Sequence, residues 1–263
     1  MKILWIGGNH PRHLYFINKL QTKFQISGAI IQKRENVIPK PSENIEEVDK
    51  VNFVKHFSNR YLTEKKFFGN PSLPKSKILK VTSLTLNSQK SVDFVNSINP
   101  DIVIIFGSDL IKDPLLSCLP KQTINLHLGL SPRYRGAATL FWPFYFLEPN
   151  YVGSTFHYIV SEPDAGDIIH QCVPTLDKDD KIHDVACKTV IVSSDEIITL
   201  LNIFKKDGKW ESFKQKGTGK NFLSSDFKPE HLRLIYNTFN DDITKNYLQG
   251  KLNPKAPNLI RQF

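Results

Sequence analysis

The chain has 263 residues, of which 40% are hydrophobic and 23% charged, a composition that excludes a mostly disordered protein. Lysine and arginine outnumber aspartate and glutamate by 35 to 26, which gives a formal net charge of +9. No apolar stretch approaches the length of a membrane span, so we expect a cytoplasmic protein without membrane insertion.

The basic residues are scattered along the chain and form no block with interleaved aromatic residues. We therefore do not expect nucleic acid as a partner, and an anionic small substrate accounts for the charge as well. The cysteines Cys118, Cys172 and Cys187 have no C-x-x-C spacing and predict neither a disulfide framework nor a zinc knuckle.

Short apolar runs alternate with helical patterns along the chain. Buried strands are predicted at residues 2–8, 25–31, 101–107 and 123–127, and helices at residues 11–23 and 88–98. A helix over residues 137–147 is expected to cover the sheet, with its end left open because Pro143 interrupts it. This alternation predicts an α/β fold with a doubly wound, mostly parallel sheet.

Residues 32–77 form an insertion in this pattern, and its role is left open. Within it, His56, Arg60, Glu64 and Phe68 recur at every fourth position, which stacks them on one face of a helix. We interpret this segment as a surface helix rather than a site.

Asn125 and His127 lie two positions apart on a predicted strand and therefore share one face of the sheet. They could be a strand-end cap and a buried core histidine. However, ligands of open parallel sheets bind beyond the carboxyl ends of the strands, and a turn flanked by Pro163 and Gly166 brings Asp164 to the same end. The three side chains suggest an acid–base site.

The segments "INLHLGLSPRYRG" and "VGSTFHYIVSEPDAGDIIHQ" resemble the signature of formyltetrahydrofolate-dependent formyltransferases, most closely the sugar-nucleotide N-formyltransferases. The resemblance covers about residues 100–175. It implies a formyltransferase-like variant of the Rossmann fold, 10-formyltetrahydrofolate as the formyl donor, and a catalytic set of Asn125, His127 and Asp164.

These residue types suit the attack of an amine on a formyl carbon. Asn125 can donate a hydrogen bond to the oxyanion, and His127 can stabilise it or relay a proton. Asp164 can orient His127 and receive the amine proton through water, whereas Asp167 is expected only to cap the turn.

The resemblance also implies a folate slot lined mainly by backbone groups, for which we name Ser108, Asp109, Leu110, Ile111 and Pro163, although residues 108–111 could simply start the next helix. Arg133 and Arg135 could bind a phosphate or carboxylate, and Arg135 could equally brace the loop. The glycine turn could bind an anion, and His157 could line the site or be structural. The substrate-binding candidates are therefore Gly8, Asn9, His10, Arg133, Arg135 and His157.

A metal site is not expected. The available ligands lack H-E-x-x-H or paired His/Cys spacing; they are His10, His13, His127, His157 and Asp164.

Residues 1–209 are expected to form the catalytic domain, which a helix over residues 182–206 completes, and residues 210–263 a small helical C-terminal subdomain. This tail is shorter and more helical in pattern than the β-rich domain of tRNA formyltransferases, and longer than a glycinamide ribonucleotide enzyme needs. We therefore expect a dTDP- or GDP-linked 4-amino-4,6-dideoxyhexose as substrate, in the synthesis of surface polysaccharide such as lipopolysaccharide O-antigen.

Two alternatives remain open: an RNA-binding enzyme like methionyl-tRNA formyltransferase, and a catalytically idle folate- or nucleotide-binding protein. The sugar, the nucleotide base and the oligomeric state, including a homodimer, also remain open.

Overall fold

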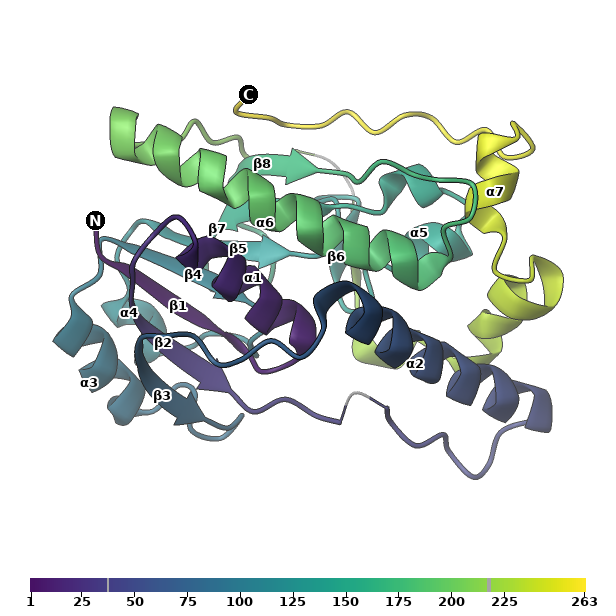
Figure 1. Cartoon of the computed structure of the whole chain (residues 1–263), viewed down its shortest axis with the longest axis horizontal. Coiled ribbons are helices and arrows are strands. Elements are labelled where there is room, and N and C mark those ends of the chain that lie inside the picture. Colours follow the sequence, from purple (N-terminus) through teal and green to yellow (C-terminus); the bar gives the residue numbers. More distant parts are fainter. Residues whose placement is uncertain (37, 217–218) are drawn as a thin grey trace.

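The computed structural model describes residues 1–36, 38–216 and 219–263 and is built on a seven-stranded sheet (Figure 1). Its order is β3-β2-β1-β4-β5-β7-β8, with β1 to β5 parallel and β7 and β8 each antiparallel to the preceding strand. The strands are β1 (Ile3–Gly8), β2 (Ile26–Gln32), β3 (Lys77–Val81), β4 (Ile102–Phe106), β5 (Thr123–His127), β7 (Ser154–Tyr158) and β8 (Ile168–Cys172). The predicted doubly wound, mostly parallel α/β fold is confirmed.

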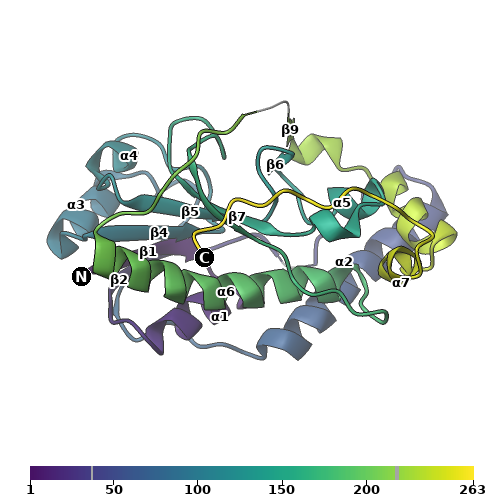
Figure 2. The ribbon, with the colours of Figure 1, turned by 90° about the horizontal axis from the view of Figure 1, so that it is seen from above.

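Helices cover both faces of this sheet (Figure 2). Ile3 and Trp5 of β1 pack toward α1 and α6, whereas Leu4 and Ile6 pack toward α3 and α4. Burial on both faces explains the continuous apolar runs of the central strands. These helices are α1 (Pro11–Gln21), α3 (Gln89–Ile98), α4 (Leu115–Cys118) and α6 (Ile182–Asp207).

The sheet reverses its winding direction beside β1, whose neighbours are β2 and β4. The buried side chain of His13 occupies the space that two glycines leave at this point. A Cβ on Gly8 would lie 2.3 Å from Nδ1 of His13, and one on Gly107 would lie 2.1 Å from Nε2. Gly107 also has a φ of +72°, in the left-handed region.

Gly107→Ala is expected to lower the free energy of unfolding by about 2–5 kcal/mol, because strain from the left-handed backbone adds to overpacking against His13. Urea unfolding measures the loss. Gly208→Ala is the matched control, since Gly208 has the same φ of +72° and no atom within 4 Å of an added Cβ. Gly208→Ala should lower the free energy of unfolding only by the cost of the left-handed backbone, about 1–2 kcal/mol. Equal losses in the two variants would contradict the packing argument.

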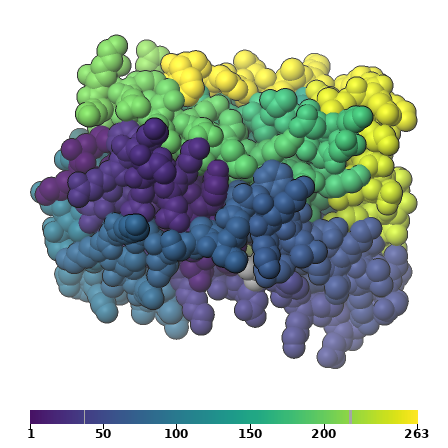
Figure 3. Space-filling model, viewed as in Figure 1, coloured from purple at the N-terminus to yellow at the C-terminus, as the bar shows by residue number. Residues whose placement is uncertain are grey.

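The insertion contains a long helix, α2 (Glu47–Phe68), which packs against α1 and α6. These three helices cover the face seen in Figure 3. The interpretation of α2 as a surface helix is wrong for one side, because His56, Glu64 and Phe68 are only 6%, 4% and 7% exposed. Spacing alone cannot tell whether a helix face meets solvent or another helix. Val37, within the insertion, lies outside the described residues.

The helix expected over residues 137–147 is reduced to a single turn, α5 (Trp142–Tyr145), which begins around Pro143. Ala138 and Leu147 have φ values of 54° and 57°, and this left-handed backbone interrupts a helix on both sides. The aromatic side chains of the segment do not cover the sheet as expected. They join the C-terminal residues in a separate core cluster.

The C-terminal part begins with β9 (Lys220–Phe222), which pairs in parallel with β6 (Tyr134–Gly136). The helical character expected here is present as short turns. Gly217 and Thr218, which belong to the expected link, lie outside the described residues. The turns of this part are η2 (Ser224–Asp226), η3 (Pro229–His231), η4 (Leu234–Thr238) and α7 (Ile243–Leu248), whereas η1 (Pro149–Tyr151) precedes β7.

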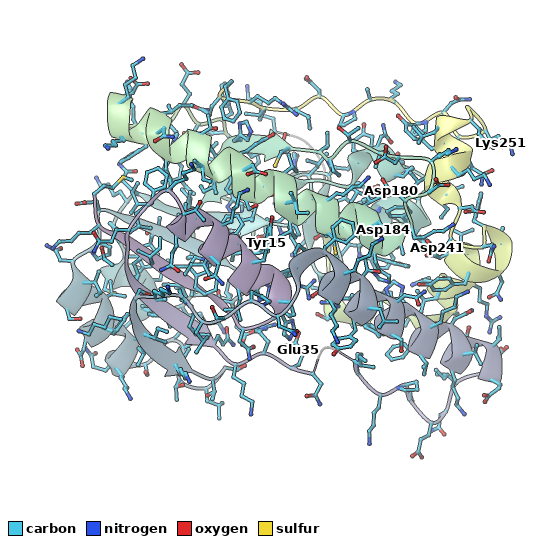
Figure 4. The ribbon with its side chains drawn as sticks, viewed as in Figure 1. Tyr15, Glu35, Asp180, Asp184, Asp241 and Lys251 are labelled. Atoms are coloured by element: carbon cyan, nitrogen blue, oxygen red, sulfur yellow. The ribbon has the colours of Figure 1, made fainter. Side chains whose placement is uncertain are left out.

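The same C-terminal part is tied to the N-terminal end of α6. The Ile182 amide donates a 3.1 Å hydrogen bond to Oδ1 of Asp241, and Figure 4 shows Asp241 near Asp184 at this end of the helix. Burial raises the pKa of Asp241 to about 6. The division after residue 209 stays a prediction, because the two parts share a core. Across the described ranges, no helix combines the length and the apolarity needed to cross a membrane.

Candidate active site

Asn125 and His127 project from β5 on one face of the sheet, while Ile124 and Leu126 face α1 and α6. This is the arrangement that strand alternation predicts. Antiparallel β7 lies alongside and places His157 directly opposite Asn125 in the register.

Asp164 reaches the same place from the turn between β7 and β8, where its backbone is left-handed with a φ of 51°. Its Oδ2 lies 3.2 Å from Nδ1 of His127 and accepts a 3.0 Å hydrogen bond from the Gly136 amide. Its Oδ1 accepts a 3.3 Å hydrogen bond from Nδ2 of Asn125. Asp164 therefore contacts both of the other expected catalytic side chains.

Two imidazole rings flank the Asp164 carboxylate, and a backbone carbonyl orients each of them. Nε2 of His127 donates to the Tyr134 carbonyl at 2.8 Å, and Nδ1 of His157 donates to the Tyr158 carbonyl at 2.8 Å. The other nitrogen of each ring faces Asp164, at 3.2 Å for His127 and 3.4 Å for His157. A neutral His127 ring would present the lone pair of Nδ1 to the carboxylate, so Asp164 opposes the loss of a proton from this ring.

The pKa values of His127 and Asp164 depend on burial and on the contact between the two side chains. Burial lowers the pKa of His127, although Asp164 opposes this effect. For Asp164, burial disfavours ionisation, but the neighbouring His127 and His157 outweigh it and hold the carboxyl pKa below its usual range. His127 and Asp164 thus form a coupled pair that can accept or release one proton.

Asn125 uses both of its amide hydrogens within the cluster. Nδ2 contacts Oδ1 of Asp164 at 3.3 Å and Nε2 of His157 at 3.1 Å. A ligand oxygen would have to replace one of these acceptors to receive a hydrogen bond from Asn125. Its role as an oxyanion donor therefore stays a prediction.

A cavity of about 230 Å³, here called the Asn125 cavity, opens beside this cluster. All five residues expected to bind folate line it, together with Asn125, His157 and Asp164. The Asp109 carboxylate is already held by Arg34 and by Nε2 of Gln32, and the Asp109 amide donates a 2.8 Å hydrogen bond to Oε1 of Gln32. The backbone carbonyl is therefore what this residue offers a ligand. The sequence did not single out the other lining residues, Ile105, Ile159, Val160 and Glu162.

A second cavity of about 400 Å³, here called the α2 cavity, lies on the other side of the loop that follows β5. Leu128 and residues 137–141 border it, and the buried face of α2 and the first turns of α6 form its walls. The sequence signal for this cavity was the four-residue spacing in α2, which we had assigned to a surface.

A group of charged side chains lies in the wall of the α2 cavity. Oε1 of Glu64 contacts Nη1 of Arg12 and Nε of Arg60, both at 3.2 Å. Two cations therefore share one anion, which leaves net positive charge at the wall. Within the described part of the chain, Nε of Arg12, Oε2 of Glu64 and Nε2 of His183 are buried without a hydrogen-bond partner. Of these atoms, Nε of Arg12 can only donate a hydrogen bond and Oε2 of Glu64 can only accept one.

The folded protein is expected to lose stability as the pH falls below about 6.5, because two histidines in this wall are neutral in the folded state. Burial lowers the pKa of His56 to about 3 and that of His183 well below its ordinary value. The unfolded chain binds these protons first, so each ring removes up to about 1.4 kcal/mol per pH unit between pH 6.5 and 3. Urea unfolding from pH 7 to 4 measures this slope. His56→Gln should make it shallower, and an unchanged slope would contradict the prediction.

The expected substrate residues at the end of β1 line neither cavity. Gly8 packs against His13, Oδ1 of Asn9 accepts a 2.8 Å hydrogen bond from the Arg34 amide, and Nε2 of His10 donates to the Glu35 carbonyl at 2.8 Å. These contacts tie the turn to the residues after β2. Anion binding by this turn stays a prediction.

The two arginines of the loop after β5 have different environments. Arg133 forms a bidentate ion pair with Glu148, with Nη2 to Oε1 at 2.6 Å, and so braces the loop rather than offering a free charge. In contrast, no carboxylate among the described residues pairs with Arg135, and its Nε is buried without a hydrogen-bond partner. The charge of Arg135 also contributes to lowering the pKa of His127. We retain only Arg135 as a candidate ligand contact.

No group of three or more His, Cys, Asp or Glu side chains is arranged to hold a metal ion in the described ranges.

Comparison with known proteins supports the assignment of this chain to the formyl transferase family. The profile of the formyl transferase family matches residues 32–199, more than half of the chain. A methionyl-tRNA formyltransferase of Clostridioides difficile (strain 630) is 32% identical over an alignment of 112 residues that covers 38% of this chain. The chain spans about a third of the length of this curated relative, with 34% matched.

Solved structures share the fold at low sequence identity. A sugar N-formyltransferase from Shewanella sp FDAARGOS_354 superposes with a TM-score of 0.56 and 18% identity, over 86% of this chain and 78% of the other. A formyltransferase from Anoxybacillus kamchatkensis, in complex with UDP-4,6-dideoxy-4-formamido-L-AltNAc and tetrahydrofolate, has a TM-score of 0.51 and 18% identity, with coverages of 93% and 97%.

Proposed function

Because the chain belongs to the formyl transferase family, we propose that it transfers a formyl group from 10-formyltetrahydrofolate to the amine of a nucleotide-linked amino sugar. The observation that carries this proposal is that Asn125 and Asp164 line the Asn125 cavity. Leu128 and Ala137, the sequence neighbours of His127 and Gly136, line the α2 cavity. A two-substrate transfer needs two binding spaces that meet at the reacting groups.

The formyl donor fits the Asn125 cavity. Its walls combine apolar side chains, including Ile105, Ile111 and Ile159, with the backbone groups of residues 108–111, and this combination suits a flat heteroaromatic ring with polar edges. Asn125 and Asp164 lie in the same wall and would meet the formyl group, which is carried on N10, the nitrogen that a methylene group joins to that ring. The relative from Anoxybacillus kamchatkensis was solved with tetrahydrofolate, which supports this choice of donor.

The residues of the cluster have distinct roles in this proposal. The donor supplies an electrophilic carbon, whose oxygen gains negative charge as the amine attacks. Asn125 stabilises that charge by donating a hydrogen bond. His127, when protonated, stabilises it through its charge, because its two ring nitrogens already contact the Tyr134 carbonyl and Asp164. The coupled His127–Asp164 pair takes the proton that the amine nitrogen loses. When the intermediate collapses, this proton can pass to the folate nitrogen that leaves.

The amino sugar and its nucleotide are assigned to the α2 cavity. Its wall carries net positive charge from Arg12 and Arg60, which can bind the diphosphate of a nucleotide-linked sugar. Leu128 and Ala137 at its border are sequence neighbours of His127 and Gly136, so the amine can approach the cluster from this side. We further propose that the reaction takes place in the cytoplasm and precedes surface polysaccharide synthesis.

Arg60→Met is expected to raise KM for the nucleotide-linked sugar by about 10–100-fold with little change in kcat, because one hydrogen bond to a charged group is lost. Initial rates with nucleotide-linked and free amino sugar measure the effect, and the free sugar should be unaffected because it lacks the diphosphate. Lys65→Met, on the exposed side of α2, is the matched control. Equal effects on the two sugars would contradict the assignment of Arg60.

The decisive experiment offers four acceptors with the same formyl donor and follows the mass gain of one formyl group. The acceptors are a panel of nucleotide-linked 4-amino sugars, the free amino sugars, glycinamide ribonucleotide and methionyl-tRNA. We expect efficient transfer only to a nucleotide-linked sugar. The identity shared with a methionyl-tRNA formyltransferase favours the fourth acceptor as the second candidate. Transfer to methionyl-tRNA without any mass gain in the sugar panel would overturn the proposed substrate.

A further inference from the structure

The segment that follows α6 passes directly behind the turn that carries Asp164. Nε1 of Trp210 donates to the Leu200 carbonyl at 2.7 Å and fixes the start of this segment. Phe213 then forms an antiparallel bridge with Ile168, with both N–H to O=C distances at 2.8 Å. This bridge places the next residues beside the turn between β7 and β8.

Gln215 of this segment binds the backbone of the turn. Its Nε2 donates to the carbonyl of Asp164 at 2.6 Å and to the carbonyl of Gly166 at 2.8 Å. The Gln215 side chain thus bridges two backbone carbonyls of the turn, that of Asp164 and that of Gly166. The half-buried Gln215 lies outside the region that the family profile matches, residues 32–199.

The turn has few other contacts that would hold it. Glu162 and Pro163 are exposed, and the Ala165 amide makes only a 3.4 Å contact with the Glu162 carbonyl. The left-handed backbone of Asp164, with a φ of 51°, is less favourable for Asp than for glycine, so contacts that hold the turn in this conformation stabilise it. The contacts of the carboxylate with the two rings, at 3.2 and 3.4 Å, leave little tolerance for movement.

We propose that Gln215 is a positioning residue, which holds the Asp164 turn so that the carboxylate faces His127 and His157. Its effect on turnover rests on the proposed function, whereas its effect on the geometry of the cluster does not. The C-terminal segment therefore completes a site whose reacting groups all come from the region matched by the family profile.

Gln215→Met tests this assignment, because it keeps the length of the side chain and removes both hydrogen bonds. Gln262→Met is the matched control, since Nε2 of Gln262 likewise donates to two backbone carbonyls, those of Ile169 and Glu211, both at 2.9 Å. Histidine NMR titrations of the free proteins report on the cluster, with the His127 signal assigned by its absence in His127→Asn. Steady-state kinetics with the nucleotide-linked sugar report on turnover.

In Gln215→Met we expect kcat to fall by about 10–100-fold with KM nearly unchanged, the scale seen when a supporting contact of a reactive group is lost. The pKa of His127 should also fall, because a displaced Asp164 no longer raises it. Gln262→Met should change neither quantity.

If Gln215→Met does not fold, Gln215→Glu replaces it. The Glu side chain donates a hydrogen bond only when protonated, so the loss of kcat relative to the parent should be largest at high pH and shrink as the pH is lowered.

The proposal would be overturned if folded Gln215→Met kept the parent's His127 pKa or the parent's kcat. Equal changes in Gln262→Met would also overturn it. If no acceptor is formylated by the parent protein, the proposed function fails, and the NMR titration alone then decides the role of Gln215.

Discussion

Asp164→Asn protein is expected to fold like the parent and to transfer the formyl group roughly 10²–10⁴ times more slowly. The amide keeps the size of the carboxylate and can still accept the hydrogen bond from the Gly136 amide. However, the amide carries no negative charge to stabilise a protonated His127, whose Nδ1 lies 3.2 Å from the carboxylate in the parent. It also cannot take the proton that the amine loses. Single-turnover rates at saturating donor and acceptor measure the loss at the chemical step.

Asp167→Asn is the matched control, because it makes the same isosteric change three positions later in the same turn. Asp167 contributes a backbone carbonyl to Tyr158, at 3.0 Å, which the substitution leaves in place. We expect its turnover to stay near that of the parent. Parent-like rates in folded Asp164→Asn would remove the carboxylate from the mechanism.

His127→Asn is expected to reduce turnover by roughly 10²–10⁴-fold, because the variant loses the ring that exchanges a proton with Asp164. The shorter amide cannot bridge the Tyr134 carbonyl and the carboxylate as the ring does through its two nitrogens. Measured at several pH values, the residual activity should also lose the part of the pH dependence that belongs to the coupled pair.

His170→Asn provides the comparison for His127→Asn. His170 is fully buried on β8 and contacts Oε2 of Glu196 on α6 at 2.5 Å. It is therefore also a histidine–carboxylate pair, but one that lines neither cavity. Its substitution should lower stability and leave the turnover of the folded protein unchanged. A rate loss equal to that of His127→Asn would assign both effects to folding rather than chemistry.

The α2 cavity links the insertion to the proposed substrate. The buried face of α2 contributes Arg60 and Glu64 to the wall next to the loop that follows β5. A helix inserted between two strands of the sheet thus forms part of the acceptor site in this proposal, and a change in that helix can alter acceptor specificity without altering Asn125, His127 or Asp164.

The sequence by itself determined the features that depend on near neighbours in the chain. The strands and helices of the sheet followed from apolar periodicity, because burial on one or two faces imposes its own spacing on the residues. Asn125 and His127 could be placed on one face since alternation is a property of a single strand. The two segments that resemble formyltransferases indicated the family, which the family profile bears out.

Only the tertiary structure decided the features that depend on residues far apart in the chain. Burial of the α2 face required α1 and α6 to pack against it, and the role of Arg133 depended on Glu148, fifteen residues away. The contact of Gln215 with the Asp164 turn joins residues 51 positions apart. Such contacts leave no periodic signal, because they are set by how strands and helices pack and not by the conformation of either segment alone.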